Sequence, residues 1–272
     1  MSADPRFRLF KTFNDSVKEV LIDFLVSPET SMMDIGSHNE EICPALMNSG
    51  LKRYSFVEKN YTNQNERREA WNKVMAAYKH SSGDHRKTID VVDMLPTDLI
   101  AESLPPGTKE KYNYVACFDG FQLMYGFNDK ERITTLVRNV AEALVPGGIF
   151  FGSVIDSSII FSAVDRSSGR AIMATEMYRI ELNASSFREF GTGAEITLNE
   201  SGVFFGSLVH FPTLINICRE YGLKMLDIQN FEEFYIDYKD SVDKKLASRG
   251  CRVHMDQLKP FRLYTTFVFQ KL

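Results

Sequence analysis

Long apolar runs, paired cysteines and an excess of positive charge are all lacking in this chain of 272 residues. No run of about eighteen apolar residues occurs, which excludes a membrane-spanning helix. The opening segment MSADPRFRLFKTF has no apolar core, so we do not expect a secretion signal. The cysteines lie far apart, with no CxxC pair and no Cys/His spacing suited to zinc: Cys43, Cys117, Cys218 and Cys251. We therefore expect reduced thiols in a cytosolic or nuclear protein, and no metal site.

The net charge of -4 provides no overall positive field that would hold a nucleic acid. Any nucleic-acid partner must therefore be met by a local groove or pocket. Repeats, low-complexity tracts and long linkers are missing as well, so we expect one continuous domain over residues 1–272.

Apolar periodicity predicts that helices and strands alternate. Helices are expected at residues 8–25, 43–48, 64–79, 131–144 and 211–221. Strands are expected at residues 31–35, 53–57, 88–92, 112–118, 149–155 and 263–270. We interpret Pro146-Gly147-Gly148 as the stop of the helix that precedes it. The alternation predicts an α/β fold with a doubly wound, parallel sheet that carries helices on both faces.

Residues 157–209 interrupt this alternation. They mix turns with short alternating runs at residues 178–182 and 194–198. These runs predict an antiparallel excursion that follows the fifth strand and lies inside the domain.

Ligands of an open parallel sheet bind beyond the carboxyl ends of its strands, near the point where strand order reverses. The residues that follow the predicted strands are therefore candidates for a site: Asp34, Gly36, Glu58, Asp93, residues 118–121 and Asp156. Glu58 suits the two hydroxyls of a ribose, because carboxylate oxygens accept hydrogen bonds from that diol. Gly36 permits a close approach of a ligand to the backbone.

Each candidate also has an interpretation without a ligand. Glu58 fits a solvated loop charge, and Asp93 fits a turn residue that bonds its own backbone. Lys18 lies on the polar side of the first predicted helix, where a surface lysine needs no function. The five histidines are interpreted as surface or packed residues, with His210 at a strand-to-helix junction.

Six segments, in this order along the chain, resemble the eukaryotic mRNA cap guanine-N7 methyltransferases. They are FNDSVKEVLI at 13–22, MMDIGS at 32–37, YSFVEKN at 54–60, the run at 121–160 with its RN and LxPGG signatures, LVHFPTLINICREYGLKML at 208–226 and NFEEFY at 230–235. The combination is far more specific than any one of these motifs. The stretches FLVSP, LVHFP and LYTTFVFQK are most similar to the divergent second cap methyltransferases of plants.

The resemblance implies a class I, Rossmann-like methyltransferase that transfers a methyl group from S-adenosylmethionine to N7 of the guanine cap of mRNA. Lys18 would face the methionine carboxylate with Asn14 beside it, and Asp34 and Gly36 would line the methionine side. Glu58 would hold the ribose diol and Asp93 would meet the adenine.

On the acceptor side, the resemblance places Tyr125 and Tyr235 against the cap guanine, and Gln122 lies nearby. No catalytic acid or base is needed, because N7 carries a free lone pair and the protein's work is mainly positioning. The implied partners are the capped 5′ end of RNA and other capping or RNA-processing proteins. The implied location is the nucleus, with the cytoplasm as the alternative, and no membrane is involved.

Several positions depart from the family pattern. The family's glycine-rich loop DLGCGKGGD appears here as DIGSHNEE at 34–41, with two or three glycines lost. The cap-contacting histidine and glutamine are replaced by Met124 and Gly120, and an ungapped alignment places a guanine-binding tyrosine at Ala194 and a glutamate at Gly206. Gly206 has no side chain to accept hydrogen bonds from the guanine edge, which would weaken discrimination of the cap.

Three functions remain open. The retained Lys18, Glu58, Asp93, Tyr125 and Tyr235 favour an active cap guanine-N7 methyltransferase with a changed pocket. The lost glycines and the replaced guanine contacts favour a weak or inactive relative that binds RNA or activates a partner. A third alternative is a methyltransferase with a different acceptor.

Overall fold

A computed structural model describes residues 5–35, 45, 49–58, 88–93, 98–164, 171–183, 186–198, 202–254 and 258–272. The described helices are α1 (Pro5–Leu25), η1 (Asp98–Ile100), α4 (Phe121–Gly126), α5 (Lys130–Ala143), α6 (Ser157–Ala163), α7 (Phe211–Glu220), α8 (Phe231–Asp237), α9 (Lys239–Ser248) and η3 (Lys259–Leu263). The helices predicted at residues 43–48 and 64–79 lie outside the described residues, apart from Ala45.

Seven strands form the main sheet in the order β10-β11-β5-β4-β1-β2-β3. They are β1 (Ser31–Asp34), β2 (Arg53–Glu58), β3 (Thr88–Asp93), β4 (Tyr112–Cys117), β5 (Leu144–Ile155), β10 (Leu223–Asn230) and β11 (Tyr264–Lys271). The strands β1 to β5 pair in parallel, whereas β11 pairs antiparallel with both β5 and β10. Strand order reverses between β1 and β4, so this sheet has the switch point of a doubly wound fold. The predicted fold class is confirmed.

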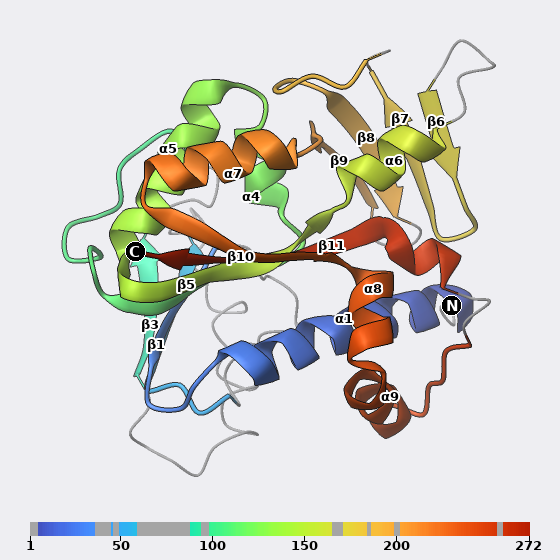
Figure 1. Cartoon of the computed structure of the whole chain (residues 1–272), viewed down its shortest axis with the longest axis horizontal. Helices are drawn as coiled ribbons and strands as arrows, with labels where there is room; N and C mark the ends of the chain where they lie inside the picture. Colours follow the sequence, from blue (N-terminus) through green and yellow to red (C-terminus); the bar gives the residue numbers. More distant parts are fainter. Residues whose placement is uncertain are drawn as a thin grey trace, which may run out of the picture.

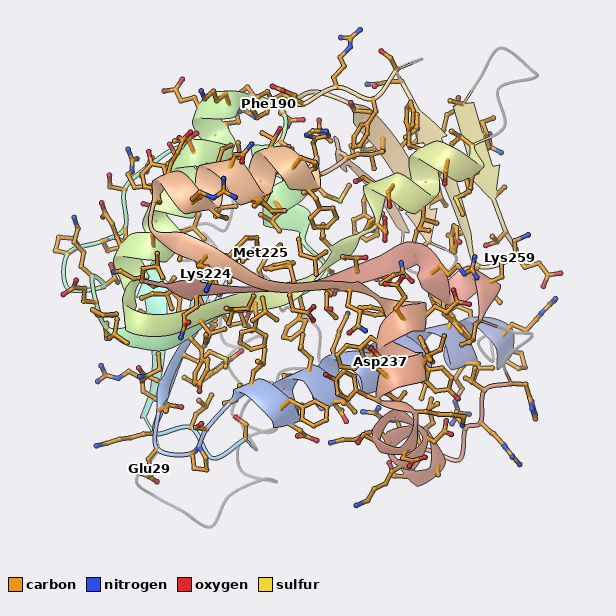
Figure 2. All side chains as sticks on the ribbon, viewed as in Figure 1. Glu29, Phe190, Lys224, Met225, Asp237 and Lys259 are labelled. Atoms are coloured by element: carbon orange, nitrogen blue, oxygen red, sulfur yellow. The ribbon has the colours of Figure 1, made fainter. Side chains whose placement is uncertain are left out.

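Helices cover both faces of the main sheet. Figure 1 shows α1, α8 and α9 on one face and α5 and α7 on the other. The side chains fill the space between the layers (Figure 2), and the helices bury apolar stripes there, as Ile133, Leu136, Val137 and Val140 of α5 do. Asp129 caps the start of α5 by accepting a hydrogen bond from the backbone N–H of Arg132 at 2.9 Å.

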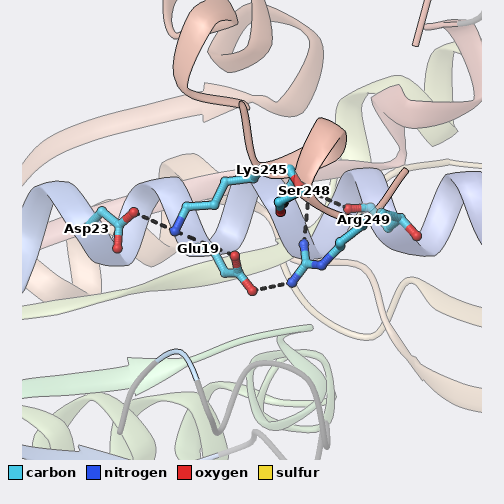
Figure 3. A network of polar contacts seen from close by, with 7 residues as sticks. Glu19, Asp23, Lys245, Ser248 and Arg249 are labelled. Carbon is cyan, nitrogen blue, oxygen red and sulfur yellow. Dashed lines mark hydrogen bonds and ion pairs between the residues drawn. The ribbon is translucent and has the colours of Figure 1, made fainter. Parts of the chain in front are cut away.

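A polar network holds α9 against α1 (Figure 3). Arg249 forms an ion pair with Glu19 and donates a hydrogen bond to Ser16 Oγ at 3.1 Å. Lys245 Nζ lies 2.7 Å from Asp23 Oδ2 and 3.6 Å from Glu19 Oε2. This network fixes the helix that carries Asn14 and Lys18.

A second sheet is antiparallel, in the order β6-β7-β8-β9. Its strands are β6 (Ala171–Ala174), β7 (Tyr178–Leu182), β8 (Gly193–Leu198) and β9 (Gly202–Ser207). This sheet confirms the predicted excursion, and Figure 1 shows it beside the main sheet.

The interpretation of Pro146-Gly147-Gly148 as a helix stop is wrong. Helix α5 ends at Ala143, and β5 begins at the next residue. The three residues lie in a bulge of β5, because Tyr112 pairs with Leu144 whereas Tyr114 pairs with Ile149. Gly147 adopts φ 77°, which glycine tolerates without steric cost.

In the described part of the chain, no helix is long and apolar enough to cross a membrane.

Candidate functional site

Two carboxylates stand at the switch point of the main sheet. Asp34 is the last residue of β1, and Asp119 follows the neighbouring strand β4 by two residues. Cys117, at the end of β4, lies close to both: burial raises the pKa of its thiol, and the negative charges of Asp34 and Asp119 raise that pKa further. The carboxyl ends of β1 and β4 therefore bring two acidic side chains to the place where an open sheet binds its ligand.

Lys18 is buried at this switch point, so the interpretation as a surface lysine is wrong. Its side chain is 3% exposed and forms an ion pair with Asp119, whose side chain is 19% exposed. Lys18 Nζ also lies 5.8 Å from the centre of the Tyr264 ring. Burying an ammonium group costs several kcal/mol unless partners compensate for the lost water. Lys18 is therefore held in place by a specific polar environment.

Asp119 was not singled out by sequence reasoning, although it falls within the segment that follows the fourth strand. The turn that carries it is tightly defined, since Asp119 and Gly120 both have φ 64°. A Cβ on Gly120 would lie 2.4 Å from Cγ2 of Val154, so only glycine fits there. The backbone N–H of Asp119 donates to Ser153 Oγ at 3.2 Å. An Asp-Gly pair directly after a predicted strand is a turn signal that could have drawn attention to this residue.

Asn14 lies one helical turn before Lys18, and residues four apart share a face of a helix. It is 6% exposed, and its Oδ1 has no hydrogen-bond partner among the described residues. Buried acceptors without a partner are rare, because leaving one unsatisfied costs free energy. Asn14 thus offers a free acceptor on the side of α1 that carries Lys18.

Asp34 is buried, and the Tyr54 hydroxyl donates a hydrogen bond to its Oδ2 at 2.6 Å. On the next strands, Glu58 pairs in register with Asp93 at the carboxyl ends of β2 and β3. The backbone therefore places both residues at the edge where Asp34 stands. The side chains of Glu58 and Asp93 and the whole of Gly36 lie outside the described residues, so their predicted roles stay predictions.

A cavity of about 560 Å³ lies between α4 and the second sheet. It is lined by Tyr125, Asn128, Glu181, Leu182, Asn183, Gly193, Ala194, Glu195, Phe205 and Gly206. Three departures from the family pattern meet here: Ala194 pairs with Gly206 across β8 and β9, and a Cβ on Gly206 would lie 3.0 Å from Cβ of Met124. The lost guanine contacts are therefore neighbours in space.

Two carboxylates belong to the same cavity. Glu181 of β7 pairs in register with Glu195 of β8, and both line the cavity. The carboxylate oxygens of these residues are acceptors only, so they suit a ligand edge that carries N–H donors.

Tyr235 and Gln122 are the other two residues predicted to contact guanine. The Tyr235 side chain is fully buried, donates a hydrogen bond to Asp243 Oδ1 at 2.9 Å and contacts the Phe13 ring edge to face. Burial and the Asp243 carboxylate raise the pKa of Tyr235. Gln122 lies in α4, and its side chain is outside the described residues. The predicted contacts of both residues with guanine stay predictions.

Asp156 has a structural role. It caps α6 by accepting from the backbone N–H groups of Ser158 and Ile159, and it also accepts from Asn230 Nδ2 at 2.9 Å and Thr265 Oγ1 at 2.6 Å. These partners fill its acceptor sites, so it has no capacity left for a ligand.

His210 also fits a packed residue. It precedes α7, where its Nδ1 lies 2.7 Å from Thr213 Oγ1 and its ring packs against Phe187.

A family model described as the mRNA (guanine-N(7))-methyltransferase domain matches residues 46–271. The chain belongs to this family. It is 26% identical to mRNA cap guanine-N(7) methyltransferase 2 of Oryza sativa subsp. japonica, over 100% of the chain and 81% of that protein. It is 32% identical to the Arabidopsis thaliana protein of the same name, over 60% of the chain and 52% of that protein.

Solved structures show the same fold at low identity. A putative S-adenosylmethionine dependent methyltransferase from Listeria monocytogenes superposes with a TM-score of 0.54 at 11% identity, covering 96% of this chain and 99% of that one. One from Mesorhizobium loti gives a TM-score of 0.52 at 14% identity, covering 94% and 98%. The main sheet is therefore that of a class I methyltransferase.

Proposed function

We propose that this chain transfers a methyl group from S-adenosylmethionine to N7 of the guanine cap of mRNA. The observation that carries the proposal is the buried ion pair of Lys18 with Asp119 at the switch point of the main sheet. The chain belongs to the mRNA (guanine-N(7))-methyltransferase family, whose name specifies this atom as the acceptor. Replacing a buried ion pair by apolar residues of similar volume often leaves a protein at least as stable. Retention of the buried Lys18 and its partner therefore indicates a function.

The residues at the switch point fit the donor. Lys18 supplies a cation for its carboxylate, Asn14 supplies a buried acceptor, and Asp34 stands beside them at the end of β1. The backbone positions of Glu58 and Asp93 suit the predicted contacts with ribose and adenine. When bound, the donor supplies a methyl group already activated by its sulfonium charge.

The cavity beside α4 fits the acceptor guanine. The Tyr125 side chain lines it, and the Glu181 and Glu195 carboxylates offer acceptors for the N1–H and N2–H donors of the base. Because N7 has no proton to lose, the protein needs only to orient the base, and orientation can lower a barrier by roughly 7–11 kcal/mol.

A binding module without activity is not favoured. The donor end keeps a buried cation, an unpaired buried acceptor and two carboxylates, and the family membership covers most of the chain. We further propose that the chain acts in the nucleus on the capped 5′ end of RNA, with other capping or RNA-processing proteins as further partners.

Transfer of a labelled methyl group tests this function. We expect the protein to label RNA that begins with GpppG and not RNA that begins with ApppG. The Lys18→Met variant should lose this transfer, whereas Lys109→Met should keep it, because the Lys109 side chain is 67% exposed and far more hydrated. Transfer to GpppG-RNA that does not exceed the level of Lys18→Met would contradict the proposal.

A further inference from the structure

We propose that Asp119 binds the ammonium group of the donor's amino-acid end, so that Lys18 and Asp119 together form a receptor for a zwitterion. This assignment rests on the proposed function and goes beyond it, because it gives a role to a residue that the family resemblance leaves without one. The two side chains carry opposite charges and touch each other, with Lys18 on α1 and Asp119 just after the carboxyl end of β4.

The hydrogen-bonding capacity of the pair leaves room for a ligand. An ammonium group has three donors, and a carboxylate has about four acceptor sites. The contact between Lys18 and Asp119 therefore leaves donors on Lys18 and acceptor sites on Asp119. An α-amino acid end carries a carboxylate and an ammonium group on one carbon, which matches a neighbouring cation and anion.

Accessibility selects Asp119 over Asp34 for the ammonium group. Asp119 is 19% exposed, whereas Asp34 is buried and already accepts from the Tyr54 hydroxyl. Asn14 Oδ1 supplies a further acceptor near Lys18 that no described residue satisfies. An ammonium group would find charged and neutral acceptors at the same place.

The backbone of the β4–α4 turn supports a functional role for Asp119. The residue is held at φ 64° by the Ser153 hydroxyl and by a following glycine that no other residue could replace. Aspartate adopts this left-handed conformation more readily than most residues, and non-glycine residues in it concentrate at binding sites. The turn places the carboxylate beside Lys18 at the switch point.

Calorimetry with three ligands tests the assignment. S-adenosylhomocysteine carries both charged groups, its decarboxylated form keeps only the ammonium group, and 5′-methylthioadenosine has neither. We expect Asp119→Asn to lower the affinity for the first two ligands about 10- to 100-fold, as for loss of a hydrogen bond to a charged group. The affinity for 5′-methylthioadenosine should change by less than about 2-fold. Lys18→Met should lower the affinity for S-adenosylhomocysteine and leave the affinities for the other two ligands unchanged.

Two further variants separate binding from folding. Lys18→Met/Asp119→Asn removes both charges together, and asparagine adopts φ 64° as readily as aspartate does. We expect it to bind 5′-methylthioadenosine normally and to lose the preference for S-adenosylhomocysteine. The matched control Asp129→Asn removes a carboxylate at the start of α5, where asparagine caps a helix equally well, and should leave all three affinities unchanged.

An equal loss of affinity for all three ligands in Asp119→Asn would overturn the assignment and show that the ion pair has a structural role. Loss of S-adenosylhomocysteine but not of its decarboxylated form would also overturn it, since it would assign Asp119 to the carboxylate end. If the unmodified protein bound none of the three ligands, the proposed function itself would fail, which is a different result from either of these.

Discussion

Ala194 and Gly206 are paired directly across β8 and β9, at the wall of the cavity that Tyr125 also lines. Two small residues in register leave space where the family pattern has a tyrosine and a glutamate. A third replaced residue adjoins this pair, because Met124 packs against Gly206. The acceptor side has therefore been altered as a unit, while Lys18 and Asp34 at the donor side are retained.

Replacing both cavity carboxylates should impair use of the cap. In Glu181→Gln/Glu195→Gln the acceptors for the guanine N–H groups lose their charge, and we expect kcat/KM for GpppG-RNA to fall by about 10-fold or more. The affinity for S-adenosylhomocysteine should not change. Glu220→Gln, on the exposed end of α7, is the matched control. Unchanged kcat/KM in the double variant would show that the cavity does not hold the guanine.

Adding a methyl group at Gly206 should strain the cavity wall. A Cβ there meets Cβ of Met124 at 3.0 Å, so Gly206→Ala should lower the free energy of unfolding by about 1–3 kcal/mol. Met124→Ala keeps that Cβ but removes Cε, which lies 3.3 Å from the same point, and should recover only part of this loss in the double variant. Urea unfolding of the four proteins measures the coupling, and strictly additive effects would show that the two residues do not press on each other.

The buried thiols should resist modification. Burial raises the pKa of Cys117 and Cys218, so neither forms a thiolate near neutral pH. Cys251 is partly exposed. We expect iodoacetamide at pH 8 to alkylate Cys251 and to leave Cys117 and Cys218 intact, as read by mass spectrometry of peptides from the native protein. Rapid alkylation of Cys117 would contradict its burial.

The same thiols predict how stability depends on pH. In the unfolded chain a cysteine ionises near about pH 8.5, whereas the native pKa is higher, so the native state keeps its protons longer. The protonated thiols therefore contribute fully to the free energy of unfolding below the pKa of the unfolded chain. As pH rises above that pKa, the contribution is lost at about 1.4 kcal/mol per pH unit for each thiol. Chemical unfolding between pH 7.5 and 10 should show a shallower decline for Cys218→Ala than for the unmodified protein. Equal slopes would argue against the raised pKa.

Disruption of the network between α1 and α9 should affect the donor site from a distance. Glu19→Gln removes the charge that pairs with Arg249 and Lys245 (Figure 3), and we expect a loss of about 1–2 kcal/mol in unfolding free energy. Because α1 also carries Asn14 and Lys18, affinity for S-adenosylhomocysteine should fall modestly. Glu189→Gln, at an exposed position outside the helices and strands, is the control and should change neither quantity.

Much of the fold could be predicted because local patterns agree with it. The alternating apolar residues of β7 and the stripe of α5 are each visible in sequence, and ordered motifs identified the family. The apolar pattern does not predict the short helix α8, although the capping box of Asn230 and Glu233 is a sequence signal for its start. Strand β10 was missed because its edge position leaves Met225 and Leu226 exposed, so apolar alternation is weak.

The site was less predictable, because contacts between residues that are far apart in the sequence leave no trace in the local pattern of apolar and polar residues. Lys18 looked like a surface residue since α1 is buried on more of its circumference than an amphipathic helix usually is. Its partner is 101 positions away along the chain. The meeting of Ala194, Gly206 and Met124 likewise required the strand register.

The position of the transferred methyl group tests the central claim most directly. RNA that begins with GpppG is incubated with the protein and labelled S-adenosylmethionine, then digested to its cap and separated against standards. The proposed function predicts that the label appears in 7-methylguanosine and that Lys18→Met abolishes it. Label in any other nucleoside, or none above the level of Lys18→Met, would contradict it.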